Sequence, residues 1–89
     1  MKVSWSRSAL DDLKEIRRYI AQHDPRAAAN VAAAIRSLRD LLRRHPMAGH
    51  EGREVGTREL VAGTYIVVHQ VLPEVVQILA VVDARRDRG

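Results

Sequence analysis

The chain contains no cysteine and no phenylalanine, and its aromatic residues are limited to one Trp and two Tyr. The absence of cysteine excludes disulfides and thiolate zinc sites. It is also typical of proteins in a reducing compartment, so a cytoplasmic location is expected. The shortage of aromatic side chains leaves little that could stack against single-stranded nucleic acid. Direct nucleic-acid binding is therefore not expected.

Long hydrophobic runs are missing as well. The longest apolar stretch, Val75 to Val82, is broken by Gln77, and it is much shorter than the roughly 20 residues that a membrane-spanning helix needs. The N-terminus lacks the charged start and apolar centre of a signal peptide. With 89 residues, 46% of them hydrophobic and 29% charged, the composition predicts one folded domain over residues 1–89 with no membrane partner.

Arginine is abundant. All but Lys2 and Lys14 of the 15 basic residues are arginine, and the net charge is +4. Because the guanidinium group pairs with carboxylates and phosphates in a bidentate geometry, an acidic protein and a nucleic acid are both chemically sensible partners. Charge alone does not choose between them.

Two helices are predicted after a short strand at Lys2 to Trp5. Ser8 is the expected N-cap of the first helix, and Asp24 followed by Pro25 begins the second. Apolar residues recur at spacings of three and four, at Ala9, Leu13, Ile16 and Ile20 in the first helix and at Ala28, Val31, Ile35, Leu38 and Leu42 in the second. The short link between them predicts an antiparallel helical hairpin.

Three strands are predicted after an irregular connection at residues 46–57. They cover Thr57 to Val61, Thr64 to Leu72 and Val75 to Asp83, all rich in β-branched residues. Turns are expected at Ala62-Gly63 and Pro73-Glu74. The element order is β-α-α-β-β-β, which predicts an α+β fold with the helical hairpin on one face of an antiparallel sheet.

The last two strands are apolar on both faces. If they form a plain two-residue hairpin, one face packs on the helices and contains Tyr65, Val67, His69, Val71, Val76, Ile78, Ala80 and Val82. The opposite face contains Ile66, Val68, Gln70, Gln77, Leu79 and Val81. A sheet face in water should be more polar than this. The second face is therefore expected to be covered, either by residues 46–57 or by a protein partner.

The order and spacing of these residues resemble a known family along nearly the whole chain. The matching residues are Trp5, Ala9, Asp12-Leu13, Ile16, Tyr19-Ile20, Asp24-Pro25, Ala27-Ala28, Leu42, Pro46, Gly49, Gly56-Thr57-Arg58-Glu59-Leu60, Tyr65-Ile66-Val67-Val68 and Ile78-Leu79-Ala80-Val81. This pattern is similar to the ParE/RelE toxin superfamily of bacterial type II toxin–antitoxin systems, and within it to the ParE side.

The resemblance implies a RelE/ParE-like fold, in which an N-terminal strand and a two-helix hairpin pack on a curved antiparallel sheet. It also implies a cognate antitoxin, ParD-like, RelB-like or similar, that wraps the toxin and neutralises it. Such a partner is a candidate to cover the second sheet face, so Ile66, Val68, Leu79 and Val81 are the predicted antitoxin-binding residues. Toxins resembling ParE act on DNA gyrase, whereas RelE-like members cut messenger RNA in the ribosome. The ParE side implies gyrase as the target.

The resemblance to the RNA-cleaving members is incomplete. Their pattern places an arginine directly after the strand tyrosine, lysines in the preceding segment and a tyrosine near the C-terminus. Here Tyr65 is followed by Ile66, residues 46–63 contain no lysine, and no tyrosine follows Tyr65. His69 is the best remaining acid/base candidate but is better explained by packing. We therefore assign no catalytic residue and expect no cofactor.

The other histidines do not predict a metal site, because His23, His45 and His50 lack the i, i+4 spacing of helical metal ligands. The arginines are better suited to docking. Arg58, Arg85, Arg86 and Arg88 are the candidate target-binding residues, with a solubilising tail as the alternative for the last three. Asp83 stands where relatives often carry histidine. A non-toxic remnant that still binds an antitoxin is therefore one alternative function. A ribosome-dependent endoribonuclease is the other, because Arg85 and Arg86 fall near where the RNA-cleaving members place another arginine.

Overall fold

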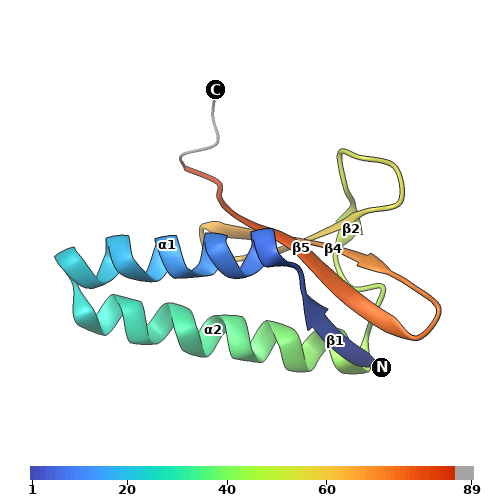
Figure 1. Ribbon diagram of the computed structural model, residues 1–89, viewed down its shortest axis with the longest axis horizontal. Helices are drawn as coiled ribbons and strands as arrows, with labels where there is room; N and C mark the ends of the chain where they lie inside the picture. The colour runs from blue at the N-terminus through green and yellow to red at the C-terminus, as the bar shows by residue number, and fades with distance from the viewer. Residues whose placement is uncertain (86–89) are drawn as a thin grey trace.

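A hairpin of two helices packs against one face of a five-stranded sheet (Figure 1). The computed structural model describes residues 1–85. Its elements are β1 Lys2–Trp5, α1 Arg7–His23, α2 Pro25–Arg44, β2 His50–Glu51, β3 Arg58–Ala62, β4 Tyr65–Val71 and β5 Val75–Asp83. The α+β class and the expected order of elements are confirmed, and the two-residue β2 is the one addition.

The strands lie in the order β1-β5-β4-β3-β2. Strands β2 to β5 pair antiparallel, but β1 pairs parallel with β5, with Lys2 opposite Val75 and Trp5 opposite Ile78. The sheet is therefore mixed rather than wholly antiparallel. Alternating side chains identify β1 as a strand, but they carry no information about the direction of a partner more than 70 residues away.

The helix starts follow local capping chemistry. Ser6, not the expected Ser8, caps α1: it is extended, with φ −69° and ψ 163°, and its hydroxyl accepts from the Ala9 N–H at 3.0 Å. Asp24 caps α2 as expected, since its carboxylate accepts from the Arg26 and Ala27 N–H groups at 3.1 and 3.3 Å. Ser8 lies inside α1 because β1 ends at Trp5, immediately before the capping residue.

A β-bulge interrupts the pairing of β4 with β5. Val68 is opposite Ala80 and His69 is opposite Ile78, so Leu79 has no residue opposite it. One extra residue in a strand reverses the alternation of side chains beyond it. The predicted face of Val81 is therefore wrong: its side chain is 4% exposed and lies in the core with the helices.

The same bulge moves two residues in the opposite direction. Ala80 and Val82, which the plain hairpin placed against the helices, lie with Ile66 and Val68 on the second face of the sheet. The residues before the bulge keep their predicted side, and Val76 and Ile78 are fully buried. The bulge therefore sets the composition of both faces of β5.

The start of α1 completes the edge of β5 beyond the end of β1. The Ser6 N–H donates to the Ile78 carbonyl at 2.9 Å, and the Ser6 hydroxyl donates to the Leu79 carbonyl at 3.1 Å. One turn and a half further along α1, the Asp12 carboxylate accepts from the Val81 N–H at 3.0 Å. The Ser6 N–H and the side chains of Ser6 and Asp12 replace the missing strand neighbour, because backbone groups at a covered edge need partners.

His69 is the one buried polar residue of the described core and is 0% exposed. Its Nε2–H donates to the Pro46 carbonyl at 3.1 Å, which ties the end of α2 to the middle of β4. Burial lowers the pKa of His69 below the ordinary 6.5, and the charge of Arg58 acts in the same direction against the Pro46 hydrogen bond. Its position supports the packing interpretation of this histidine.

Gly49 ends the segment from Pro46 to Gly49, in which the Pro46 carbonyl accepts the hydrogen bond from His69. Its φ is +92°, and a Cβ at this position would collide with the carbonyl group of Glu59. The Gly49 carbonyl in turn accepts from the Arg58 guanidinium at 2.9 Å. The segment from Pro46 to Gly49 is thus fixed to the helix side of the sheet, and it does not reach the second face.

Replacing Asp12 by alanine should lower the free energy of unfolding by about 1–3 kcal/mol, because the part-buried Val81 N–H loses its acceptor. The matched control is Asp11→Ala, which removes an exposed carboxylate 3.9 Å from Arg7 and should change stability by at most about 0.5 kcal/mol. Urea unfolding of both variants gives the comparison. Equal losses in the two variants would contradict the role of Asp12 at the edge of β5.

Acid should destabilise the fold through His69. The unfolded chain takes up a proton near pH 6.5, whereas the folded chain takes it up only at lower pH. Between these two pKa values the unfolded state binds more protons, so the free energy of unfolding falls as the pH falls below about 6.5. His69→Gln should flatten this dependence in urea titrations at several pH values. An unchanged slope in His69→Gln would refute the assignment.

Candidate protein-docking face of the sheet

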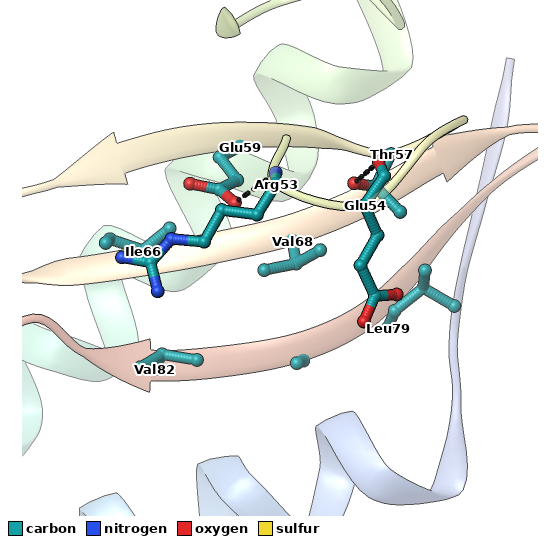
Figure 2. Close-up of a pocket in the computed structure, with 9 residues that line it drawn as sticks. Arg53, Glu54, Thr57, Glu59, Ile66, Val68, Leu79 and Val82 are labelled. Atoms are coloured by element: carbon teal, nitrogen blue, oxygen red, sulfur yellow. Dashed lines mark hydrogen bonds between the residues drawn. The ribbon is translucent and has the colours of Figure 1, made fainter. Parts of the chain in front are cut away.

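The second face of the sheet carries an apolar groove (Figure 2). The groove encloses about 260 Å³. Its floor consists of aliphatic side chains from β4 and β5, namely Ile66, Val68, Leu79, Ala80 and Val82. All of them are half-buried, so the floor is accessible to a partner, and neither α1 nor α2 packs on it. This arrangement suits contact with an apolar side chain of a partner.

The loop between β2 and β3 forms the polar rim of the groove. In Figure 2 the side chain of Arg53 extends toward Ile66, and that of Glu54 extends toward Leu79, at opposite ends of the groove. The loop is held by hydrogen bonds from the Arg53 N–H to Glu59 Oε2 at 3.1 Å and from the Thr57 hydroxyl to the Glu54 carbonyl at 2.7 Å. The loop therefore covers the face in part and leaves the groove between its side chains.

The apolar surface continues toward the edge of the sheet. Val61 is paired with Ile66, and Ile66 with Val82, so these residues form a row across three strands. The outermost of them, Val61, is 58% exposed. Val55, at the tip of the loop, is fully exposed. Exposed aliphatic residues beside an apolar groove enlarge the surface that water would leave on docking.

Three of the four predicted antitoxin-binding residues come together in this groove. Ile66, Val68 and Leu79 are on its floor, whereas Val81 is in the core for the reason given above. Ala80 and Val82 were missed because strict alternation assigned them to the other face, and no local signal in the sequence marks the bulge. The hydrophobic character of the face follows from the β-branched residues in both strands.

The candidate target-binding arginines are not a free cluster. The Arg85 guanidinium binds the Asp83 carboxylate in a bidentate manner, through Nε at 3.2 Å and Nη2 at 3.1 Å, and the Asp83 carboxylate also accepts from the Arg85 N–H at 2.9 Å. Hydrogen bonding to Asp83 raises the pKa of Arg85 above its already high ordinary value. Arg86 and Arg88 lie outside the described residues.

Arg58 lies away from Arg85, because it is at the start of β3 opposite His69, whereas Arg85 follows Asp83, which pairs with Tyr65 at the other end of β4. It is half-buried at the start of β3, on the helix side of the sheet and opposite His69. One of its guanidinium nitrogens donates to the Gly49 carbonyl, as described above, while its Nε is buried without a partner among the described residues. The geometry therefore gives Arg58 a structural contact and does not join it to the arginines that follow β5.

The described part of the chain contains no group of three or more histidine, aspartate or glutamate side chains that could hold a metal ion. Among residues 1–85, no helix has the length and apolar character needed to cross a membrane. The second face presents an apolar surface with charged residues at its rim, and protein interfaces have the same arrangement of an apolar core and a polar rim.

Solved structures of similar fold include proteins from three bacteria. A chromosomal ParDE TA system from P. aeruginosa matches with a TM-score of 0.82 and 23% identity, covering 91% of this chain and 92% of that chain. The toxin–antitoxin complex RelBE2 from Mycobacterium tuberculosis matches with a TM-score of 0.65 and 26% identity, covering 92% and 88%. The solution structure of HP0894 from Helicobacter pylori matches with a TM-score of 0.58 and 16% identity, covering 91% of each chain.

Sequence comparison points to the same group. The chain is 39% identical over 87 residues to Y4kP of Sinorhizobium fredii, a protein named as a candidate toxin, and the match covers 96% of this chain and 90% of that protein. The family model described as the ParE toxin of the type II toxin-antitoxin system parDE matches residues 3–88. The chain therefore belongs to the ParE toxin family of type II toxin–antitoxin systems.

Proposed function

We propose that the protein is a cytoplasmic toxin that inhibits DNA gyrase by binding to it and is neutralised by a cognate antitoxin. The observation that carries this proposal is the match of the ParE toxin family model to residues 3–88. In this proposed mechanism the toxin uses no active site of its own. Its effect comes from occupying a surface on an essential enzyme.

The antitoxin is proposed to dock on the second face of the sheet. The similar structures include a ParDE system and a RelBE2 toxin–antitoxin complex, which supports a protein partner of the antitoxin class. The apolar floor at Ile66, Val68 and Leu79 supplies the contact area, and Arg53 and Glu54 supply opposite charges at its ends. Such a rim favours a segment with complementary charges in one orientation.

A ribosome-dependent endoribonuclease is the second candidate, favoured by the similarity to RelBE2. Cleavage of RNA without a metal needs acid/base side chains within reach of the 2′-hydroxyl. His69 is 0% exposed beneath Pro46, and Tyr65 is 9% exposed. Neither side chain is positioned to meet a substrate, which supports binding over cleavage. A non-toxic remnant is the third candidate, because the resemblance to the toxin superfamily places Asp83 where its members often carry histidine.

The ion pair at the end of β5 refines the proposed contact with the target. Asp83 offsets the charge of Arg85 but also fixes its guanidinium group, and only two of its five N–H donors are used by the side chain of Asp83. A fixed guanidinium loses little conformational entropy on binding. We propose that Arg85 presents its remaining donors to the target, together with Arg86 and Arg88, and that Arg58 contacts it separately.

Purified toxin should inhibit DNA supercoiling by gyrase and should leave ribosome-bound mRNA intact. Truncation after Asp83 removes Arg85, Arg86 and Arg88 and keeps β5 complete. Inhibition of supercoiling should then fall at least tenfold, while the circular dichroism spectrum should show that the fold is retained. Full supercoiling at high toxin concentration would contradict the gyrase target. Rapid mRNA cutting would instead support the endoribonuclease, and no growth defect on induction would support the remnant.

A lysine in the groove should weaken antitoxin binding without unfolding the toxin. Val68→Lys and Leu79→Lys each place a charge on the half-buried apolar floor, so affinity for the product of the neighbouring open reading frame should fall about tenfold or more. Isothermal titration measures the loss. Ala33→Lys, at an exposed position on α2, is the control and should bind normally.

Val81→Lys is the structural counterpart of those variants. Because Val81 is 4% exposed in the core, this change should unfold the chain. Unchanged antitoxin affinity in Val68→Lys and Leu79→Lys would argue against the docking face, whatever the toxin's target is.

A further inference from the structure

The loop between β2 and β3 presents an aliphatic side chain to water. Val55 is fully exposed at the tip of this loop, which projects away from both helices (Figure 1). The tip is a β-turn in which the Thr57 N–H donates to the Glu54 carbonyl at 3.1 Å, with Gly56 at φ +85°. Because the turn is closed and glycine supplies the positive φ at its third position, the backbone that carries Val55 is fixed.

Val55 has no role in the core of its own chain. It is not among the residues that pack in the core or line the groove on the second face, and it borders a separate hollow beside Met47 and Val71. Turns favour glycine, asparagine, aspartate, serine and proline rather than a β-branched residue. An aliphatic side chain held in water beside an apolar groove is instead suited to contact with another molecule.

The groove on the second face is the complement of this side chain. It encloses about 260 Å³ above an aliphatic floor, and the same loop that carries Val55 forms its rim. One region of one chain therefore holds both a protruding apolar side chain and an apolar groove. A twofold dimer needs a surface of this kind, because each contact between two different residues occurs twice. Two copies can exchange loop tips, with each Val55 entering the groove of the other copy.

The charges at the rim distinguish the two ways in which the faces can meet. Arg53 and Glu54 are both exposed and extend toward opposite ends of the groove (Figure 2). A twofold axis across the groove places Arg53 of each copy at Glu54 of the other, whereas an axis along the groove brings like charges together. The first arrangement is therefore favoured. Five N–H donors allow the guanidinium group to serve a contact in its own chain and another in the partner.

We propose that two copies of the toxin form a closed dimer through the second face of the sheet, with each Val55 in the groove of the other copy. The contact area is at the small end of protein interfaces, so a dissociation constant of about 10 µM is expected. Well below this concentration the toxin is a monomer with an open groove.

The dimer would regulate access to the second face. Self-association needs neither gyrase nor an antitoxin, so it holds whatever the target is. Only its consequence rests on the proposed function: the second copy and the antitoxin would compete for one groove. Free toxin would then hide its apolar face at high concentration and expose it on dilution.

Sedimentation velocity of the purified full chain, without antitoxin, tests the dimer at about 1 to 200 µM, a range that includes the expected dissociation constant. The average mass should rise with concentration and level off at twice the monomer mass. A mass that stays at that of the monomer would overturn the proposal. A mass that continues to rise beyond the dimer would also overturn it, because contacts between two different surfaces build open chains.

Val55→Asp should weaken self-association by about tenfold or more, because it puts a carboxylate on the side chain that enters the apolar groove. Val55 is fully exposed, so the fold should be retained. Val68→Lys, which charges the groove floor, should have the same effect. The control is Leu10→Asp, on α1 and 42% exposed, which should leave the dimer intact. Equal losses in Val55→Asp and Leu10→Asp would indicate nonspecific apolar association and contradict the proposal.

Reversing the rim charges tests the direction of the twofold axis. Arg53→Glu leaves acidic side chains at both ends of the groove, so self-association should weaken about three- to tenfold. Adding Glu54→Arg to this variant restores opposite charges at each contact and should restore the affinity. A double variant as weak as Arg53→Glu alone would exclude the proposed arrangement.

Crosslinking separates the dimer from the antitoxin site, since the chain has no other cysteine. A mixture of Val55→Cys chains and Val82→Cys chains should be joined by a short bismaleimide, and a mixture of Leu10→Cys and Val82→Cys chains should not. Equal crosslinking in the two mixtures would refute the dimer. The product of the neighbouring open reading frame should suppress the crosslink. Crosslinking that persists in its presence would count against the proposed antitoxin face and leave the self-association standing.

Discussion

The extra residue in β5 determines which side chains the sheet turns toward solvent. Because Leu79 is not paired across to β4, Val81 turns into the core and Val82 turns outward. This reversal places Ala80 and Val82 on the floor of the groove on the second face. Ser6 and Asp12 hold the bulged backbone from α1, so the helix that closes the core also fixes the surface on its far side.

The helix side of the sheet is fixed by a different set of contacts. His69 is inaccessible to solvent, and its hydrogen bond to the Pro46 carbonyl joins β4 to the end of α2. The hydrogen bond from Arg58 to the Gly49 carbonyl joins β3 to the same segment. The segment from Pro46 to Gly49 therefore stays on the helix side, and only the following loop reaches the second face with Arg53 and Glu54. This division leaves an accessible apolar surface on the second face of the sheet.

Periodic patterns in the sequence were sufficient for the elements and for much of the core. The spacing of Ile35, Leu38 and Leu42 predicts the buried stripe of α2, and Asp24-Pro25 predicts its start. The parallel pairing of β1 and the bulge at Leu79 could not be predicted, because both depend on contacts between residues distant in sequence. The N-cap at Ser6 was not predicted because Ser6 and Ser8 are both suitable capping residues near the start of α1.

The residues of the candidate site also divide into those that local patterns predict and those that depend on contacts between distant residues. Ile66, Val68 and Leu79 were predictable because they alternate on strands with apolar residues on both faces. Ala80, Val82 and the loop residues Arg53 and Glu54 required the three-dimensional register. Asp83 and Arg85 are only two positions apart, but the sequence does not indicate which of the neighbouring charges form an ion pair. Their pairing was therefore not predicted.

The most direct test of this account is the reactivity of a single thiol at Val82, in a chain that has no other cysteine. Val82→Cys should react with a maleimide in the free toxin, because the bulge turns this position into the groove, and it should be protected when the product of the neighbouring open reading frame is bound. Ser37→Cys, exposed on α2, serves as the reference. A thiol at position 82 that is unreactive in the free toxin, or equally reactive in the complex, would contradict the docking face described above.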